Sequence, residues 1–84
     1  MSDTIQCWLV ERTYDDKGLI RLFYAPPDGS GQFITERAAA TGADATAAIE
    51  VDPEKLDPVE KENTDRYENE AARMAERHDP DESI

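Results

Sequence analysis

The residues best able to do chemistry in this 84-residue chain are one cysteine and one histidine, and they lie far apart in the sequence. Cys7 stands beside Trp8 in the most apolar part of the chain, with no adjacent basic residue to make its thiolate reactive. We therefore interpret Cys7 as a packed, inert thiol. A pair with His78 would require the end of the chain to fold over its beginning. A single cysteine also excludes an intramolecular disulfide and a paired-cysteine metal site.

His78 is followed by Asp79, Asp81 and Glu82, a group that could suggest a metal site. The second histidine expected in such a site is absent from the sequence. A histidine at the C-terminal end of a helix is sufficiently explained by its favourable interaction with the helix dipole. The sequence therefore predicts no metal site and no cofactor.

Two further segments contain residue types found in ligand sites but lack the spacing. The acidic residues between positions 50 and 62 do not follow the pattern of a calcium-binding loop, and Asp28–Gly31 lacks the lysine of a phosphate-binding loop. We interpret the first as a solvated face and the second as a hairpin turn. The acidic residues concerned are Glu50, Asp52, Glu54, Asp57, Glu60 and Glu62. Since no nucleophile, acid–base pair or metal cage is identifiable, the sequence predicts a protein that is not an enzyme.

The apolar residues that must build a core are concentrated in the first half of the chain. Leu, Ile, Val and Phe number 14 of 84 residues, a fraction typical of disorder, but nine of them lie between Ile5 and Ile34. This concentration favours a folded sheet. We expect strands at Ile5–Tyr14, Leu19–Ala25 and Gln32–Glu36, joined by turns at Asp15–Gly18 and Pro26–Gly31. Arg37–Asp44 is compatible with a short helix or a loop, and Ala45–Val51 with a fourth strand.

A single helix is predicted near the end of the chain. Asp52-Pro53 and Asp57-Pro58 each place a capping residue before a proline, and Asp79-Pro80 ends the helical pattern. One apolar stripe is formed by Tyr67, Ala71, Met74, Ala75 and His78. The fold class predicted is α+β: a small antiparallel sheet of three or four strands, with one C-terminal amphipathic helix packed on one face. Residues 1–80 would form one domain and residues 81–84 a flexible acidic tail.

The net charge of −11 restricts the partners of the chain. It argues against general nucleic-acid binding and against adhesion to an anionic membrane. No apolar run approaches the roughly 20 residues of a membrane span, and no secretory signal is recognisable. Residues 1–42 have a net charge of −2 and residues 43–84 one of −9, with 3 lysines against 6 arginines overall. We interpret this composition as that of a cytoplasmic protein adapted to molar salt, where the screening length falls to about 3 Å. A disordered acidic tail on a small mesophilic domain is the alternative.

Four segments carry a resemblance to a known family. They are Cys7–Arg12, Phe23–Ala25, Pro27–Gly29 and Met74–Pro80, and through them the chain resembles a family of short, acidic, uncharacterised proteins conserved in halophilic archaea. The resemblance implies a halophilic cytosolic protein and assigns no catalytic or binding residue.

The first two strands suggest where a partner would bind. If residue i pairs with residue 32−i, Glu11 lies opposite Arg21 and Leu9 opposite Phe23, which places large apolar residues on both faces. One helix covers only one face, so we predict that the other contacts a protein partner or a second copy, unless residues 37–44 cover it. The predicted interaction residues are Trp8, Leu9, Phe23 and Tyr24, with Arg12 and Arg21.

The function that these observations favour is a non-enzymatic protein–protein interaction or regulatory module of a halophile cytosol. The alternative is single-stranded nucleic-acid binding on the sheet face, with aromatic rings stacking on bases and arginines contacting phosphates. The residues would be Trp8, Tyr24 and Phe33, with Arg12, Arg21 and Arg37. Exposed aromatics would favour this alternative and buried aromatics would exclude it. A small enzyme or ligand-binding protein is the third hypothesis.

Overall fold

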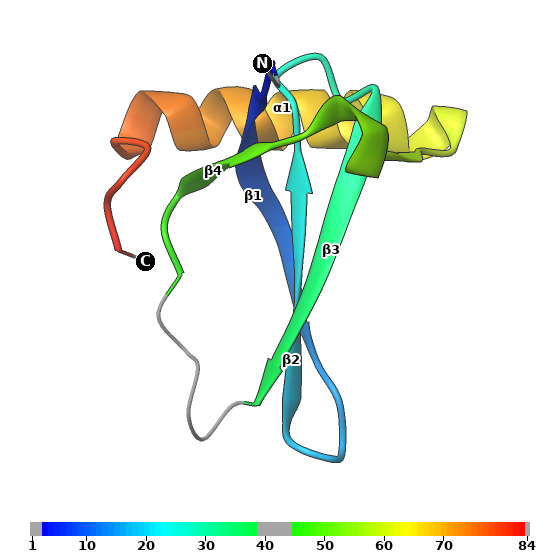
Figure 1. Ribbon diagram of the computed structural model, residues 1–84, viewed down its shortest axis with the longest axis vertical. Helices are drawn as coiled ribbons and strands as arrows, with labels where there is room; N and C mark the ends of the chain where they lie inside the picture. Colours follow the sequence, from blue (N-terminus) through cyan, green and yellow to red (C-terminus); the bar gives the residue numbers. More distant parts are fainter. Residues whose placement is uncertain (1–2, 39–44, 84) are drawn as a thin grey trace.

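The computed structural model describes residues 3–38 and 45–83, which form an antiparallel sheet with a helix packed across it (Figure 1). The sheet has five strands in the order β4-β1-β2-β3-β5. The strands are β1 (Ile5–Tyr14), β2 (Leu19–Ala25), β3 (Gly31–Ala38), β4 (Ala48–Val51) and β5 (Asp57–Pro58), with the 3₁₀ turn η1 (Pro53–Lys55) and the helix α1 (Lys61–Arg77). The predicted α+β class and the docked C-terminal helix are confirmed. The sheet has five strands rather than three or four, because a two-residue strand adds to its edge.

The β1–β2 hairpin has the predicted bounds. Its turn is held by Asp15, whose Oδ1 accepts hydrogen bonds from the backbone N–H groups of Lys17 (2.9 Å) and Leu19 (3.0 Å). Gly18 takes a φ of 82°, the left-handed conformation that glycine adopts without a steric penalty. The third strand is longer than predicted, since β3 runs to Ala38. The remaining residues of the segment left open as helix or loop, 39–44, lie outside the described residues.

The predicted register of this hairpin is wrong. Leu9 pairs with Tyr24, but Glu11 pairs with Phe23, because Val10 is an extra residue that forms a β-bulge in β1. Glu11 and Arg21 are therefore not opposite each other. Each has another partner: Arg21 binds Glu36 on β3, and Glu11 binds Arg66 on α1. The predicted sum of 32 is wrong on both sides of the bulge, because the numbers of paired residues add to 34 beside the turn and to 33 beyond Val10.

The sheet curls around its own inner face, and this closes the core. β4 and β5 lie at opposite edges of the sheet, yet only residues 52–56 join them along the chain. The inner face holds one buried cluster, into which half-buried Leu56 packs from the segment between η1 and β5. The buried members are Cys7, Leu9, Ile20, Leu22, Tyr24, Ala45 and Val51. The prediction of an uncovered apolar face containing Leu9 is therefore wrong, because the curled sheet and its connecting segments cover that face.

The helix α1 lies across the outer face of the sheet (Figure 1), where Ala71 packs with Trp8 and two alanines of the β4 segment. It begins at Lys61 rather than near Pro58, since Asp57-Pro58 forms the edge strand β5. The predicted cap at Asp52 is confirmed for η1, where its Oδ1 accepts from the N–H of Glu54 at 3.0 Å.

The apolar stripe of α1 is narrower than predicted. Tyr67 and Ala71 are buried and Met74 is half-buried, but Ala75 is exposed. The reason is angular: at 100° per residue, Ala75 lies about 80° from Tyr67 around the helix, beyond the edge of the contact.

The C-terminal segment returns to the sheet. Among its described residues, Glu82 and Pro80 accept hydrogen bonds through their carbonyl groups from the N–H groups of Ala47 (2.9 Å) and Ala48 (3.0 Å), and Ser83 forms a bridge with Thr46. Residues 81–83, which were expected to belong to a flexible tail, thus lie beside residues 46–48 at the start of β4. Neither α1 nor η1, the helices of the described residues, has the length and apolar sequence that a membrane crossing requires.

Candidate functional site

The six residues predicted to form an interaction surface do not lie on one surface. Trp8, Leu9 and Tyr24 are buried, at 5%, 5% and 1% exposure, and belong to the core. The other three reach solvent: Phe23 is half-buried, while Arg12 and Arg21 are exposed. Only these three can contact a partner without opening the domain.

The aromatic platform required for nucleic-acid stacking is not available at the surface. Tyr24 and Trp8 lie inside the domain, and Phe33 is half-buried against the same inner cluster. Burial raises the pKa of the Tyr24 hydroxyl, an effect that the positive charges of Arg37 and Arg12 partly oppose. Base stacking on Trp8 and Tyr24 would require the core to open, which counts against this alternative.

An apolar patch remains on the outer face of the sheet, and we call Phe23 and Ile34 the outer patch. They are direct cross-strand partners on β2 and β3, so their side chains share one face. Ile34 is 37% exposed and is one of two large hydrophobic residues exposed in the described part of the chain, the other being Tyr14 at the hairpin tip. Sequence reasoning missed Ile34. The adjacent apolar pair Phe33-Ile34 was the available signal, because neighbouring strand residues point to opposite faces.

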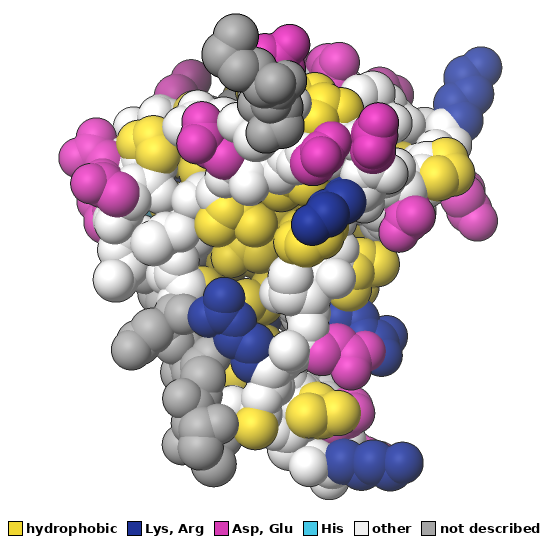
Figure 2. All heavy atoms as spheres, in the orientation of Figure 1, with side chains coloured by type: hydrophobic (Ala, Val, Ile, Leu, Met, Phe, Trp, Pro, Cys, Tyr) yellow, Lys and Arg dark blue, Asp and Glu magenta, His cyan; other side chains and the backbone are white. Residues whose placement is uncertain are grey.

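The charges around the outer patch are paired. Arg21 binds Glu36 at 2.9 Å on one side, and Arg66 binds Glu11 at 3.1 Å on the other. Elsewhere, acidic side chains crowd the part of the molecule that holds α1, β4 and η1 (Figure 2). The outer patch is therefore bordered by locally neutral pairs in a strongly acidic protein.

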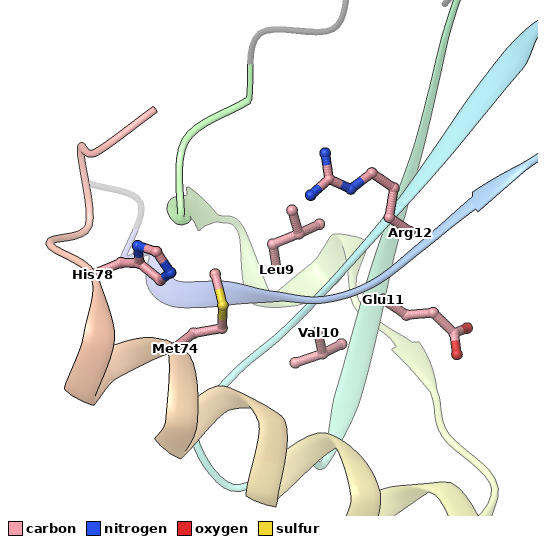
Figure 3. A pocket seen from close by; sticks show the side chains of 6 residues that line it. All are labelled: Leu9, Val10, Glu11, Arg12, Met74 and His78. Carbon is pink, nitrogen blue, oxygen red and sulfur yellow. The ribbon is translucent and has the colours of Figure 1, made fainter. Parts of the chain in front are cut away.

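A groove with a volume of about 240 Å³ lies between β1 and the C-terminal end of α1, and we call it the β1–α1 groove. It is lined by Leu9, Val10, Glu11, Arg12, Met74 and His78. Arg12 and Leu9 lie on one side of β1, whereas Glu11 points away on the other side, toward its partner Arg66 (Figure 3). Arg12 thus lies in the groove without an ion pair to the adjacent Glu11.

The bulge at Val10 creates this groove, because it bends β1 at the point where the pairing with β4 ends. His78 closes one end of the groove, and its Nδ1 contacts the Glu82 carboxylate. Sequence reasoning missed Val10 and Met74 as lining residues. The signal was the run Trp8-Leu9-Val10, which breaks the two-residue alternation of a regular strand.

The residues considered for catalysis do not converge. Burial, with a smaller contribution from the charge of Asp28, raises the pKa of the Cys7 thiol to about 11. The thiol donates a long hydrogen bond, 3.6 Å, to the carbonyl of Ile5, and the thiolate form is disfavoured at neutral pH. Within the described residues, no three His, Cys, Asp or Glu side chains are grouped to hold a metal ion.

The Asp28–Gly31 segment is a turn, as predicted. The Asp28 Oδ1 accepts from the Ser30 N–H at 3.0 Å, and hydrogen bonds from Ser30 lower the pKa of this carboxyl. Gly29 has a φ of 69° and packs against the backbone of Thr64 on α1. The turn therefore positions the helix on the sheet.

Comparison with known proteins gives a family but no function. Neither the curated proteins nor the solved structures contain a match to this chain. A family of unknown function, DUF7967, matches residues 1–84, and the chain therefore belongs to that family.

Proposed function

We propose that this protein is a non-enzymatic interaction module of a halophile cytosol that works as a homodimer through the outer patch. The observation that carries the proposal is the cross-strand pair Phe23–Ile34, in which Phe23 is half-buried and Ile34 is 37% exposed on the same face of the sheet. An apolar pair held on adjacent strands gives a partner a fixed surface to pack against.

The charge distribution supports a second copy as the occupant. Two chains of net charge −11 repel each other, so they can meet only where the local charge is low. The outer patch is bordered by the Arg21–Glu36 and Arg66–Glu11 pairs, which are neutral as pairs. The acidic side chains over α1 and η1 disfavour a contact between two copies through those elements.

The composition supports the molar-salt environment. Lysine is scarce and acidic residues outnumber basic ones by 20 to 9. At about 1 M salt the screening length is about 3 Å, which removes most of the repulsion between the two copies. We therefore expect the dimer to be stronger in salt.

The test is the solution mass in about 2 M KCl, measured by light scattering. The parent chain should approach twice its mass of 9.4 kDa, and the mass should fall as salt is removed. Phe23→Glu and Ile34→Glu should each give the monomer mass while retaining the parent circular dichroism spectrum. Two positions are used because half-buried Phe23 contributes to folding, whereas Ile34 is 37% exposed.

The matched control is Tyr14→Glu, which adds the same charge at a more exposed apolar residue outside the outer patch. It should remain dimeric. A mass of 9.4 kDa for the parent chain at every practical concentration would overturn the homodimer proposal.

A further inference from the structure

We propose that the free edge of β1 beyond the bulge, together with the β1–α1 groove, binds an extended segment of a partner protein as an added strand. A carboxylate of that segment would bind Arg12, and an adjacent apolar side chain would enter the groove. This surface is separate from the outer patch and does not depend on dimer formation.

The first observation is that β1 is longer than β4, the strand that pairs with its edge away from β2. β4 pairs with residues Ile5 to Trp8 only, and one further hydrogen bond joins the Leu9 N–H to the Ala47 carbonyl at 2.9 Å. From Val10 to Tyr14, no strand of the described residues pairs with this edge. An unpaired edge of this kind is a template for main-chain pairing.

The direction of the peptide groups follows from the hairpin. The Asp15 N–H donates to the Leu19 carbonyl at 3.0 Å, and bonded and non-bonded pairs alternate along an antiparallel ladder. The register then makes Thr13–Arg21 and Glu11–Phe23 bonded pairs. The N–H and C=O groups of the intervening residues, Arg12 and Tyr14, therefore point away from β2, toward the free edge.

The second observation is the wall beside this edge. Met74 on α1 and His78, the residue after its end, face β1 across the groove, and Leu9 and Val10 supply its apolar lining (Figure 3). A volume of about 240 Å³ accommodates one medium-sized apolar side chain and part of its backbone. Strand addition gives affinity through main-chain hydrogen bonds and specificity through such pockets.

The third observation is the charge at the groove. Arg12 is exposed and lies in the groove, while Glu11 is directed to the other side of β1 and bound to Arg66. The His78 ring is in contact with the Glu82 carboxylate, so Glu82 already has a cationic partner when His78 is protonated. Arg12 therefore provides a guanidinium for a carboxylate of the incoming segment, from either an acidic side chain or a chain terminus.

The experiment is an NMR titration of the full chain in about 2 M KCl, with salt at that level to screen non-specific charge effects. The probe is an eight-residue amidated peptide of alternating threonine and valine that carries one leucine–glutamate pair at its centre. We expect amide shifts from Val10 to Tyr14 and at Met74 and His78. A second probe moves the carboxylate to a free C-terminus, directly after leucine, with no glutamate. The peptide that binds more tightly shows whether Arg12 prefers a side-chain carboxylate or a C-terminal carboxylate.

Variants at two positions separate main-chain from side-chain recognition. Tyr14→Pro removes one edge N–H without removing a β1–β2 hydrogen bond, and should weaken binding roughly tenfold, whereas Tyr14→Ala should change it little. Arg12→Gln should weaken the glutamate peptide about threefold and leave its glutamine analogue unchanged.

Absence of amide shifts along β1 at millimolar peptide, or equal binding by Tyr14→Pro and Tyr14→Ala, would overturn the proposal. Phe23→Glu should still bind the peptide, so failure of the homodimer and failure of strand addition give different results.

Discussion

Residues 5–38 and residues 45–83 differ in what they bury and in what they expose. The strands β1 and β2 bury large side chains, among them Trp8, Leu22 and Tyr24, whereas most of the buried residues of the second half are alanines. The second half also carries most of the negative charge. It is therefore held by close approach of small residues and by backbone hydrogen bonds to a hairpin that supplies the apolar volume. We therefore predict that atoms or charges added where the second half contacts the first half lower the stability of the fold.

The largest expected effect comes from placing a charge in the helix–sheet contact. Ala71 is 1% exposed and packs with Trp8, so Ala71→Asp buries a carboxylate without a partner and should cost about 3–5 kcal/mol. Ala75, one turn further along α1, is exposed, and Ala75→Asp should cost less than about 0.5 kcal/mol. Thermal melts in molar KCl measure both. Similar melting temperatures for the two variants would show that α1 is not docked by this face.

The second contact point is the turn between β2 and β3. A Cβ on Gly29 would lie 2.3 Å from the Thr64 carbonyl oxygen of α1, and the φ of 69° is unfavourable for alanine. Gly29→Ala should therefore cost about 2–4 kcal/mol, from backbone strain and overpacking together. Gly18→Ala is the matched control, since its φ is 82° with no atom within 4 Å, and should cost about 1–2 kcal/mol. Equal losses in denaturant titrations would mean that the turn does not support the helix.

The sequence predicts the elements better than their contacts. The hairpin was predictable because β-branched and aromatic runs flank the turn Asp15–Gly18, and the helix because its apolar stripe is regular. The start of α1 was not, since Asp57-Pro58 suits both a helix cap and an edge strand, where proline is tolerated. The closed inner face was not predictable either. It depends on how strongly the sheet curls, which brings Leu56 to the core from a segment with weak strand signals.

The candidate site was less predictable than the fold. Of the predicted interaction residues, Arg12 and Arg21 are exposed and Phe23 is half-buried, but Trp8, Leu9 and Tyr24 fill the core. The bulge at Val10 changes the register, and a single inserted residue leaves no mark in the charge pattern.

A smaller effect would test the charge difference between the halves directly. Glu68→Gln with Glu76→Gln neutralises two exposed acids of α1, and Asp3→Asn with Asp16→Asn neutralises two exposed acids of the first half. In dilute buffer the Glu68/Glu76 double variant should stabilise the fold by about 0.5 kcal/mol more than the Asp3/Asp16 double variant. The reason is that Glu76 also lies near the negative end of the helix dipole. In about 2 M KCl the two double variants should melt alike. A parent chain whose melting temperature does not rise with KCl would remove the argument for adaptation to salt.

The smallest expected effect tests the pairing register of β1 and β2. Arg21 is bound to Glu36 at 2.9 Å, with both side chains about half exposed, so the pair should contribute roughly 0.2–1 kcal/mol. A double-mutant cycle with Arg21→Ala and Glu36→Ala should give this coupling energy in dilute buffer. The same cycle with Arg21→Ala and Glu11→Ala should give a coupling near zero, because Glu11 lies opposite Phe23 and binds Arg66. A hairpin in the register predicted from the sequence would instead place Glu11 opposite Arg21 and give the second cycle a measurable coupling energy. The direction of the Arg12 and Tyr14 peptide groups toward the free edge of β1 follows from this register, so the pair of cycles tests the structural basis of strand addition without a ligand.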